Sequence, residues 1–261
     1  MKGDDNMGIF EKVMAGMGIG AARVEITLEK QVYRLGEEIE GKLIIHSGGE
    51  DQTVDKVYLN LKMDAKQRSE HIVRSATTAQ IADGFTIKAN SPPREINFLY
   101  RLPYYIPVSS NRIQYTLKVG LDIKNALDPY VMQPVQIRPS LEMEAILEAL
   151  KGLGFVHTPD SGELERDTQI FAFYPSGFMQ GKLAELEILF NQNKTNLYLY
   201  LELDRKAKGL SWLFMKPLYL DDKHSRFTIP STELVAGGRP SIERASRMVT
   251  AFIQQEFNKM L

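Results

Sequence analysis

The aspartate and glutamate residues of this sequence are its main candidates for catalysis. Glycoside hydrolysis, for example, needs only two carboxylates that face each other across a sugar. The candidates that stand out are Asp122, Asp128, Glu185, Glu187 and the pair Asp221-Asp222. Glu185 and Glu187 are two positions apart, so on a strand they share one face, the polar complement of the face that carries Leu186 and Ile188. This spacing favours a solvated surface over a catalytic pair.

Most other catalytic and metal-binding chemistries lack their usual residues. The chain has no cysteine, which excludes disulfides, thiolate zinc sites, iron–sulfur clusters and a cysteine nucleophile. The serines have neither a Gly-x-Ser-x-Gly elbow nor a paired lysine. The histidines are far apart, and none has a second histidine or a glutamate at metal-ligand spacing; they are His46, His71, His157 and His224. We therefore expect no catalytic residue, no metal and no cofactor.

A cationic and aromatic segment is the best local candidate for a partner-binding site. Arg205, Lys206 and Lys208 precede Phe214 and Trp212, the only tryptophan of the chain. Cations beside aromatic rings bind anions, membranes or protein partners. The alternative is a loop at the end of a strand, in which the cations are solvated and both aromatic side chains lie in the core.

An apolar stripe near the N-terminus predicts a second docking element. Ile9, Phe10, Val13 and Met14 recur at steps of three and four residues, as on one side of a short amphipathic helix within segment 1–21. We expect this helix to dock on protein. The alternative, a helix lying on a membrane, is weaker because the stripe spans barely three turns and only two lysines lie near it.

Length and charge narrow the class of protein further. The chain has 261 residues, of which 32 are Lys or Arg and 33 are Asp or Glu, so its formal charge is −1. Such a balance gives no overall field that would attract nucleic acid. The apolar runs are far shorter than the roughly 20 residues that cross a bilayer, and the first residues do not resemble a secretory signal. We expect a cytoplasmic protein whose partners are other proteins.

Alternating apolar and polar residues predict a first β-domain at 22–139. Strands follow strands without a helix of crossover length between them, which is typical of an antiparallel sandwich. The clearest strands are 24–28, 57–63, 96–102 and 113–123, and weaker ones are 39–45, 71–73, 85–87 and 131–137. Turn residues such as Asp83-Gly84 and Ser91-Pro92-Pro93 separate them.

A helix in the linker 140–154 and a second β-domain at 155–261 complete the predicted architecture. Ser140 can cap the linker helix, and the alternation resumes at 170–174, 186–190 and 197–203. Ser241 can cap a C-terminal helix that we expect to pack on the second sandwich.

Several segments carry a resemblance to a known family. Tyr33-x-x-Gly36-Glu37-x-Ile39-x-Gly41-x-Leu43-x-Ile45 resembles the first sheet of arrestin-like domains. Three others are similar to the bacterial sporulation-control protein of the stage-zero M family: Gly18-Ile19-Gly20-Ala21-Ala22-Arg23-Val24, Leu121-Asp122-Ile123-Lys124-Asn125-Ala126-Leu127-Asp128-Pro129 and Leu201-Glu202-Leu203-Asp204-Arg205-Lys206-Ala207-Lys208-Gly209-Leu210. The resemblance implies a mainly β protein with two tandem arrestin-like sandwiches, no catalytic centre and a regulatory role early in sporulation.

Three functions stay open at this point. The first is a non-catalytic adaptor whose partners add to sheet edges or dock on faces. The second is a carbohydrate-binding or carbohydrate-active sandwich, with Tyr198/Tyr200 or Trp212 as an aromatic platform and Glu202 as a carboxylate. The third is a peripheral membrane adaptor that uses the N-terminal helix and the Arg205/Lys206/Lys208 cluster. A homo-oligomer is compatible with all three.

Overall fold

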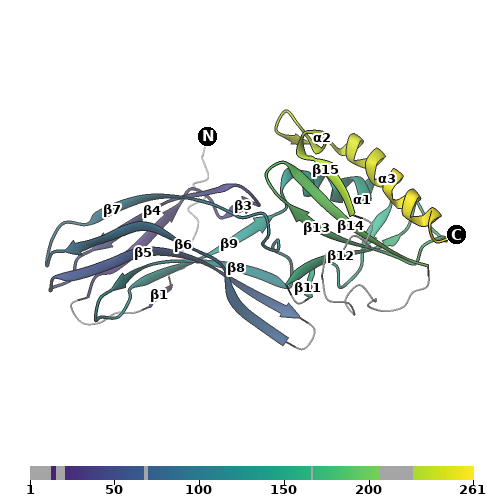
Figure 1. Cartoon of the computed structure of the whole chain (residues 1–261). Helices are drawn as coiled ribbons and strands as arrows, with labels where there is room; N and C mark the ends of the chain where they lie inside the picture. Colours follow the sequence, from purple (N-terminus) through teal and green to yellow (C-terminus); the bar gives the residue numbers. More distant parts are fainter. Residues whose placement is uncertain (1–12, 16–20, 68–69, 166, 206–225) are drawn as a thin grey trace, which may run out of the picture.

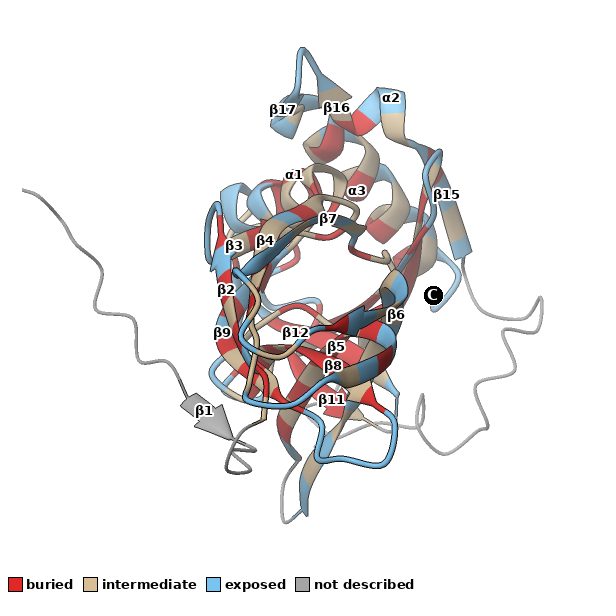
Figure 2. Ribbon diagram, turned by 90° about the vertical axis from the view of Figure 1, so that its left-hand side faces the viewer, coloured by how far each residue is buried: buried red, intermediate tan, exposed pale blue. Residues whose placement is uncertain are grey.

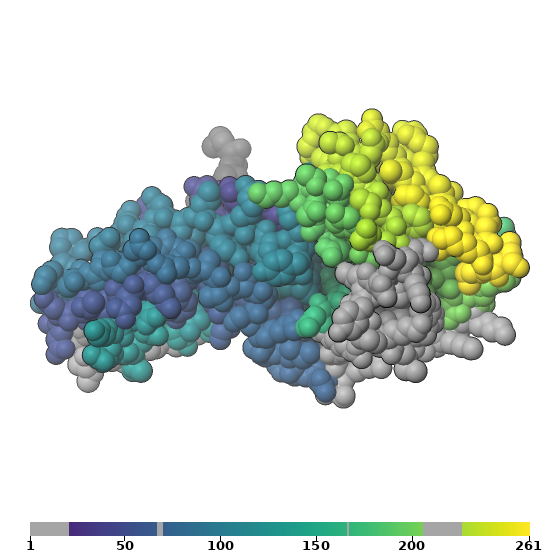
Figure 3. All heavy atoms as spheres, viewed as in Figure 1, coloured from purple at the N-terminus to yellow at the C-terminus, as the bar shows by residue number. Residues whose placement is uncertain are grey.

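The computed structural model describes residues 13–15, 21–67, 70–165, 167–205 and 226–261, and only the backbone of 13–15. The protein is mainly β, as predicted. An elongated N-terminal part, up to residue 139, abuts a C-terminal part that begins at residue 140 (Figures 1 and 3). Among the described residues, no helix is long and apolar enough to cross a membrane.

The N-terminal part is a sandwich of two sheets. The larger sheet has the order β1-β9-β8-β5-β6, and β3 pairs in parallel with β9. Its strands are β1 (Val13–Ala15), β9 (Tyr130–Arg138), β8 (Ile113–Ile123), β5 (Gln52–Gln67), β6 (Glu70–Ile87) and β3 (Val32–Arg34). The smaller sheet has the order β2-β4-β7, with strands β2 (Arg23–Leu28), β4 (Glu38–His46) and β7 (Arg94–Arg101). In β8, every second residue from Ile113 to Ile123 is buried, so the alternation builds the core between the sheets.

The C-terminal part is built on one sheet with the order β10-β12-β13-β14-β15, in which β11 also pairs with β12. Its strands are β10 (Phe155–His157), β11 (Glu163–Glu165), β12 (Thr168–Pro175), β13 (Glu185–Gln192), β14 (Asn196–Asp204) and β15 (Arg226–Pro230). The helices are α1 (Leu141–Gly152), α2 (Ser231–Leu234) and α3 (Ile242–Asn258), and a short hairpin joins β16 (Val235–Ala236) to β17 (Arg239–Pro240). Figure 1 shows α1 and α3 together against the sheet.

One hydrophobic core extends through both parts. It contains Leu59 and Leu117 of the sandwich, Ile146 of α1, and Leu199 and Ile253 of the C-terminal part, all of them buried. Figure 2 shows buried positions, in red, along strands and helices of both parts. Because apolar burial is the main driving force of folding, the two parts stabilise each other.

Local signals at the helix ends are mostly confirmed. Ser140 is the N-cap of α1, and its side chain accepts a hydrogen bond from the N–H of Met143. Gly154 follows the helix with a φ of +86°, a conformation that favours glycine. Ser241 stands at the N-cap of α3, but its side chain makes no capping hydrogen bond, so that part of the prediction is wrong.

Two predicted elements differ in the structure. Val13 and Met14, expected on a helix, lie in strand β1, where the backbone bonds to β9 replace helical ones. The two short strands predicted around Asp83-Gly84 are one continuous strand, β6. A Cβ on Gly84 would lie 2.6 Å from the main-chain oxygens of Val54 and Asp55, so this glycine allows close approach of β5 and does not end a strand.

The predicted second sandwich includes 206–225, which lie outside the described residues, and therefore stays a prediction.

Candidate functional site

The predicted cationic cluster falls largely outside the described residues. The segment 206–225, which lies outside the described residues, contains Lys206, Lys208, Trp212 and Phe214. Arg205 is exposed at the end of β14, with its guanidinium 5.5 Å from the ring centroid of Phe257 and Nη1 3.4 Å from the carbonyl oxygen of Met260. Phe257 is in the last turn of α3 and Met260 follows the helix, so Arg205 has a structural role at the end of α3.

The N-terminal docking element is described only in its second half. Ile9 and Phe10 lie outside the described residues. Val13 pairs with Met132 and Met14 with Val131, both in antiparallel register on β9. This backbone pairing makes the segment an added strand of the larger sheet instead of an amphipathic helix.

Directly opposed positions of β13 and β14 bring two carboxylate pairs together: Glu187 with Glu202, and Glu185 with Asp204. Glu187 and Glu202 are each only 6% exposed. The prediction that Glu187 lies on a solvated face is therefore wrong: this face of the sheet is covered. Both carboxylates have interaction partners. Burial, followed by the charges of Asp204 and Asp160, raises the pKa of the neighbouring Glu185.

The pair Glu187 and Glu202 does not favour a glycosidase. Carboxyl groups on directly opposed strand positions are close enough for a retaining mechanism. However, a sugar must reach both of them, and side chains that are 6% exposed offer no path to a polysaccharide. Tyr200, proposed as part of an aromatic platform, is itself 8% exposed and packs on Ile170 and Leu189.

A serine–histidine pair lies at the edge of the C-terminal sheet. Nδ1 of His157 is 2.7 Å from Oγ of Ser161, and the same Oγ accepts a hydrogen bond from the N–H of Ala172 at 3.0 Å. The imidazole is tilted over Phe173, 4.4 Å between ring centroids, and burial lowers the pKa of His157. These contacts fasten the turn between β10 and β11 to β12. Within the described ranges, no three His, Asp or Glu side chains come together as a metal site.

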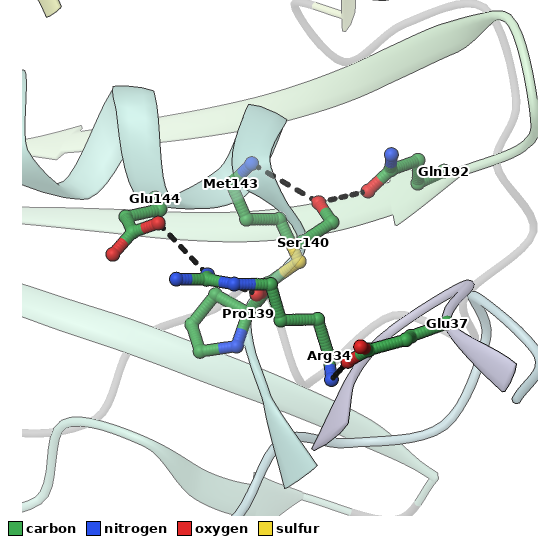
Figure 4. A network of polar contacts seen from close by, with 7 residues as sticks. All are labelled: Arg34, Glu37, Pro139, Ser140, Met143, Glu144 and Gln192. Atoms are coloured by element: carbon green, nitrogen blue, oxygen red, sulfur yellow. Dashed lines mark hydrogen bonds and ion pairs between the residues drawn. The ribbon is translucent and has the colours of Figure 1, made fainter. Parts of the chain in front are cut away.

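Arg34 joins the sandwich to helix α1. Its Nη1 donates to the carbonyl oxygen of Pro139 at 3.0 Å and is 2.8 Å from Oε2 of Glu144 (Figure 4). Its main-chain N–H donates to Oε2 of Glu37 at 2.7 Å. Burial alone would raise the pKa of Glu37, but hydrogen bonds from Lys30 and from that N–H outweigh burial and lower it. Arg34 therefore fixes the chain where it leaves β9 and enters α1.

Ser140 continues this contact into the C-terminal sheet. Its hydroxyl accepts from the N–H of Met143 at 3.2 Å and donates to Oε1 of Gln192 on β13 at 2.6 Å (Figure 4). Ser140 is 2% exposed. A buried hydroxyl with both roles satisfied holds the helix start in one position against the sheet.

Gln169 makes a buried polar contact between the two parts. Its Oε1 accepts from the N–H of Val108 at 2.8 Å, and its Nε2 donates to the carbonyl oxygens of Val108 at 3.1 Å and of Gly162 at 3.0 Å. The amide thus pairs with the backbone of the sandwich as another strand would. Gln169 is 9% exposed and Val108 3%, so water competes little for these bonds.

Ion pairs also connect the two parts. Arg112 of the sandwich lies 2.8 Å from Glu163 and 3.4 Å from Asp160. Arg74, in the N-terminal half of β6, pairs with Asp167. The Arg112–Glu163 pair is partly buried, whereas exposed pairs such as Arg74–Asp167 add little free energy individually. Arg112 directly precedes β8 and Arg74 is on β6, so these pairs connect two further points of the sandwich to the C-terminal part. We define Arg34, Ser140, Gln169 and their partners as the junction.

The family model described as SpoOM protein matches residues 10–207, which is more than half of the chain. The chain belongs to the Spo0M family. This match includes β1 to β14 and every residue of the junction.

A sequence match and a solved structure, both of Spo0M from Bacillus subtilis, accompany this result. The sporulation-control protein Spo0M of Bacillus subtilis (strain 168) is 29% identical over 223 residues, which cover 79% of this chain and 85% of that protein. The crystal structure of Spo0M from Bacillus subtilis has a TM-score of 0.72 and 23% identity, and the match covers 93% of this chain and all of that one. The likeness to the crystal structure shows that the fold is shared.

The sequence indicated Spo0M membership but gave little sign of the junction. Ser140 is recognisable from the sequence as the N-cap of a helix. Arg34 and Gln169 had no motif around them, because their partners are 105 and 61 positions away in the chain. The nearest signal for Gln169 is a polar residue that begins a buried apolar strand.

Proposed function

We propose that this Spo0M-family chain is a non-catalytic, cytoplasmic regulatory adaptor that acts through contacts with other proteins. Two domains, 22–139 and 155–261, are joined by the linker helix 140–154. The observation that carries the proposal is the junction: the buried hydrogen bonds between Gln169 and Val108 and the ion pair of Arg34 with Glu144 hold the two parts in one relative orientation. A partner that contacts both parts therefore meets a surface whose shape is set in advance.

Preorganisation is what an adaptor of this kind requires. Holding two binding surfaces in a fixed relation lowers the entropy that is lost when a partner binds to both. Catalysis would instead require an accessible acid, base or nucleophile, and Glu187 and Glu202, which face each other on β13 and β14, are covered. The name of the Bacillus subtilis relative, a sporulation-control protein, supports a regulatory role.

The experiment that tests the proposal is quantitative affinity capture of the full chain from the cytosol of its native bacterium. Three tagged proteins are compared: the wild type, Gln169→Ala and Arg205→Glu/Lys206→Glu. We expect the wild type to capture a reproducible set of proteins and Gln169→Ala to lose those that need both parts. If the double charge variant captures the same set as the wild type, the cationic cluster is not the binding site.

A hydrolase assay tests the alternative, a carbohydrate-active protein. The purified chain is incubated with a panel of soluble glycans, alongside Glu187→Gln and Glu202→Gln. Release of reducing sugar by the wild type that disappears in either variant would overturn the non-catalytic proposal. Absence of specific partners in the capture experiment would overturn the adaptor proposal.

A further inference from the structure

Strand β6 (Glu70–Ile87) is an edge strand of unusual length. It lies at the end of the larger sheet, and among the described residues it pairs only with β5. Figure 2 shows it on the flank of the sandwich opposite β2, β3 and β9. Each second backbone N–H and C=O on its outer side therefore points away from the sheet and can pair with another strand.

The middle of β6 lacks the side chains that normally protect an edge. The stretch Ser75–Ala82 reads Ser-Ala-Thr-Thr-Ala-Gln-Ile-Ala and has no charge, no proline and no glycine. It is about 27 Å long at roughly 3.4 Å per residue. Natural edge strands usually carry a lysine or a proline in such a stretch, because an uncharged edge is a template for pairing. Ser75, Thr78 and Gln80 are all exposed.

The β6 edge is complementary in shape to the β6 edge of a second copy. Two register shifts against β5 leave Ala76 and Ile81 as extra, bulged residues. These bulges lie at equal distances from the midpoint of the stretch Thr77–Gln80. A two-fold rotation about that region places the bulge of one strand opposite the bulge of its copy to within one residue. Bends that would obstruct an unrelated straight strand are therefore matched by a second β6.

The edge is also held in place before any pairing. Oγ1 of Thr77 is 2.6 Å from the hydroxyl of Tyr100 on β7, and the guanidinium of Arg94 lies 3.9 Å from the ring centroid of Phe85. Both contacts connect β6 to the other sheet of the sandwich. A fixed edge loses less entropy on pairing than a mobile one.

We propose that two copies of this chain associate by antiparallel pairing of their β6 strands about a two-fold axis at Thr78. Counted along the strand, this places Thr78 opposite Thr78 of the second copy, Arg74 opposite Ala82, and Asp83 opposite Val73. No two like charges face each other. The central Thr–Thr pair is favourable across antiparallel strands. Such an interface is closed, because each chain has one β6, so the assembly stops at two copies.

This inference concerns self-association and does not depend on the adaptor proposal. The test uses the full chain in sedimentation velocity over a range of concentrations, with the wild type, Thr78→Lys and Thr78→Glu. The control is Gln114→Lys, an exposed position of the same sheet on β8, two strands from the edge. Thermal unfolding of each variant verifies that it is folded.

We expect the wild type and the Gln114→Lys control to reach twice the 29.6 kDa mass of the chain. Each Thr78 variant places two like charges opposite each other, so we expect its dissociation constant to rise at least tenfold. An equimolar mixture of Thr78→Lys and Thr78→Glu brings opposite charges together and restores the dimer.

Three results would overturn the proposal. The first is a wild type that stays monomeric at the highest concentration, even if β6 captures a different protein. The second is dimerisation of Thr78→Lys with wild-type affinity, which would place the interface elsewhere. The third is loss of the dimer in both single variants without recovery in the mixture, since this excludes the stated register.

Discussion

Replacing Gln169 with alanine is the sharpest test of the junction. The side chain makes three hydrogen bonds, two with the main chain of Val108 and one with the carbonyl oxygen of Gly162. The substitution leaves all three backbone groups without these partners in a buried place, and each such group costs about 1–3 kcal/mol. Water that enters the space of the lost amide recovers part of this cost. We expect the free energy of unfolding to fall by about 3 kcal/mol.

The measurement is thermal and urea unfolding combined with hydrogen exchange. For a chain of this size, about 3 kcal/mol corresponds to a Tm lower by roughly 6–12 °C. The main-chain N–H of Val108 should exchange faster, because Oε1 of Gln169 is its acceptor. The matched control is Gln114→Ala at an exposed position of β8, which should change the free energy of unfolding by less than about 0.5 kcal/mol. A loss below that size at Gln169, with Val108 exchange unchanged, would refute the reasoning.

Further predictions concern the start of α1 and the turn beside it. Ser140→Ala should lower the free energy of unfolding by about 2 kcal/mol in urea titrations, whereas Ser241→Ala, which removes no capping bond, should change it by less than about 0.5. Gly36→Ala should cost about 2–4 kcal/mol in the same titrations, since its φ is +78° and a Cβ would overlap the ring of Tyr104; a wild-type midpoint would contradict this. Burial raises the pKa of Glu37, but its hydrogen bonds outweigh burial and lower it, so its carboxylate stabilises the fold at neutral pH and loses this effect as pH falls. The stability difference between wild type and Glu37→Gln should therefore be largest near pH 7 and shrink below the ordinary pKa of 4.5; a difference that is independent of pH would contradict this.

The parts of the fold that were predictable depend on short-range patterns. Every second residue of β8 is apolar, and every second residue is buried, because a strand turns alternate side chains toward the core. Ser140 was recognisable as a cap since its bond reaches only to the N–H three positions away. Such signals involve neighbouring residues, so they are present in the sequence itself.

The parts that were not predictable depend on tertiary contacts. The stripe at Val13 and Met14 fits a helix as well as a strand, and pairing with β9 decides for the strand. Glu187 has the spacing of an exposed residue, yet this face of the C-terminal sheet is covered. Gln169 finds its acceptor and donor groups only when the sandwich meets β12. In each case the deciding partner lies far away in the chain.

The continuous core has a practical consequence for anyone who wishes to divide this protein into fragments. A cut between residues 139 and 140 would leave Val108 without the amide that covers its backbone and would expose the apolar residues that the two parts share. Each fragment would then expose an apolar surface that is buried in the whole chain. Two-hybrid or pull-down screens with either fragment alone would therefore return non-native partners. Binding sites on this protein should therefore be mapped by point substitutions in the uncut chain.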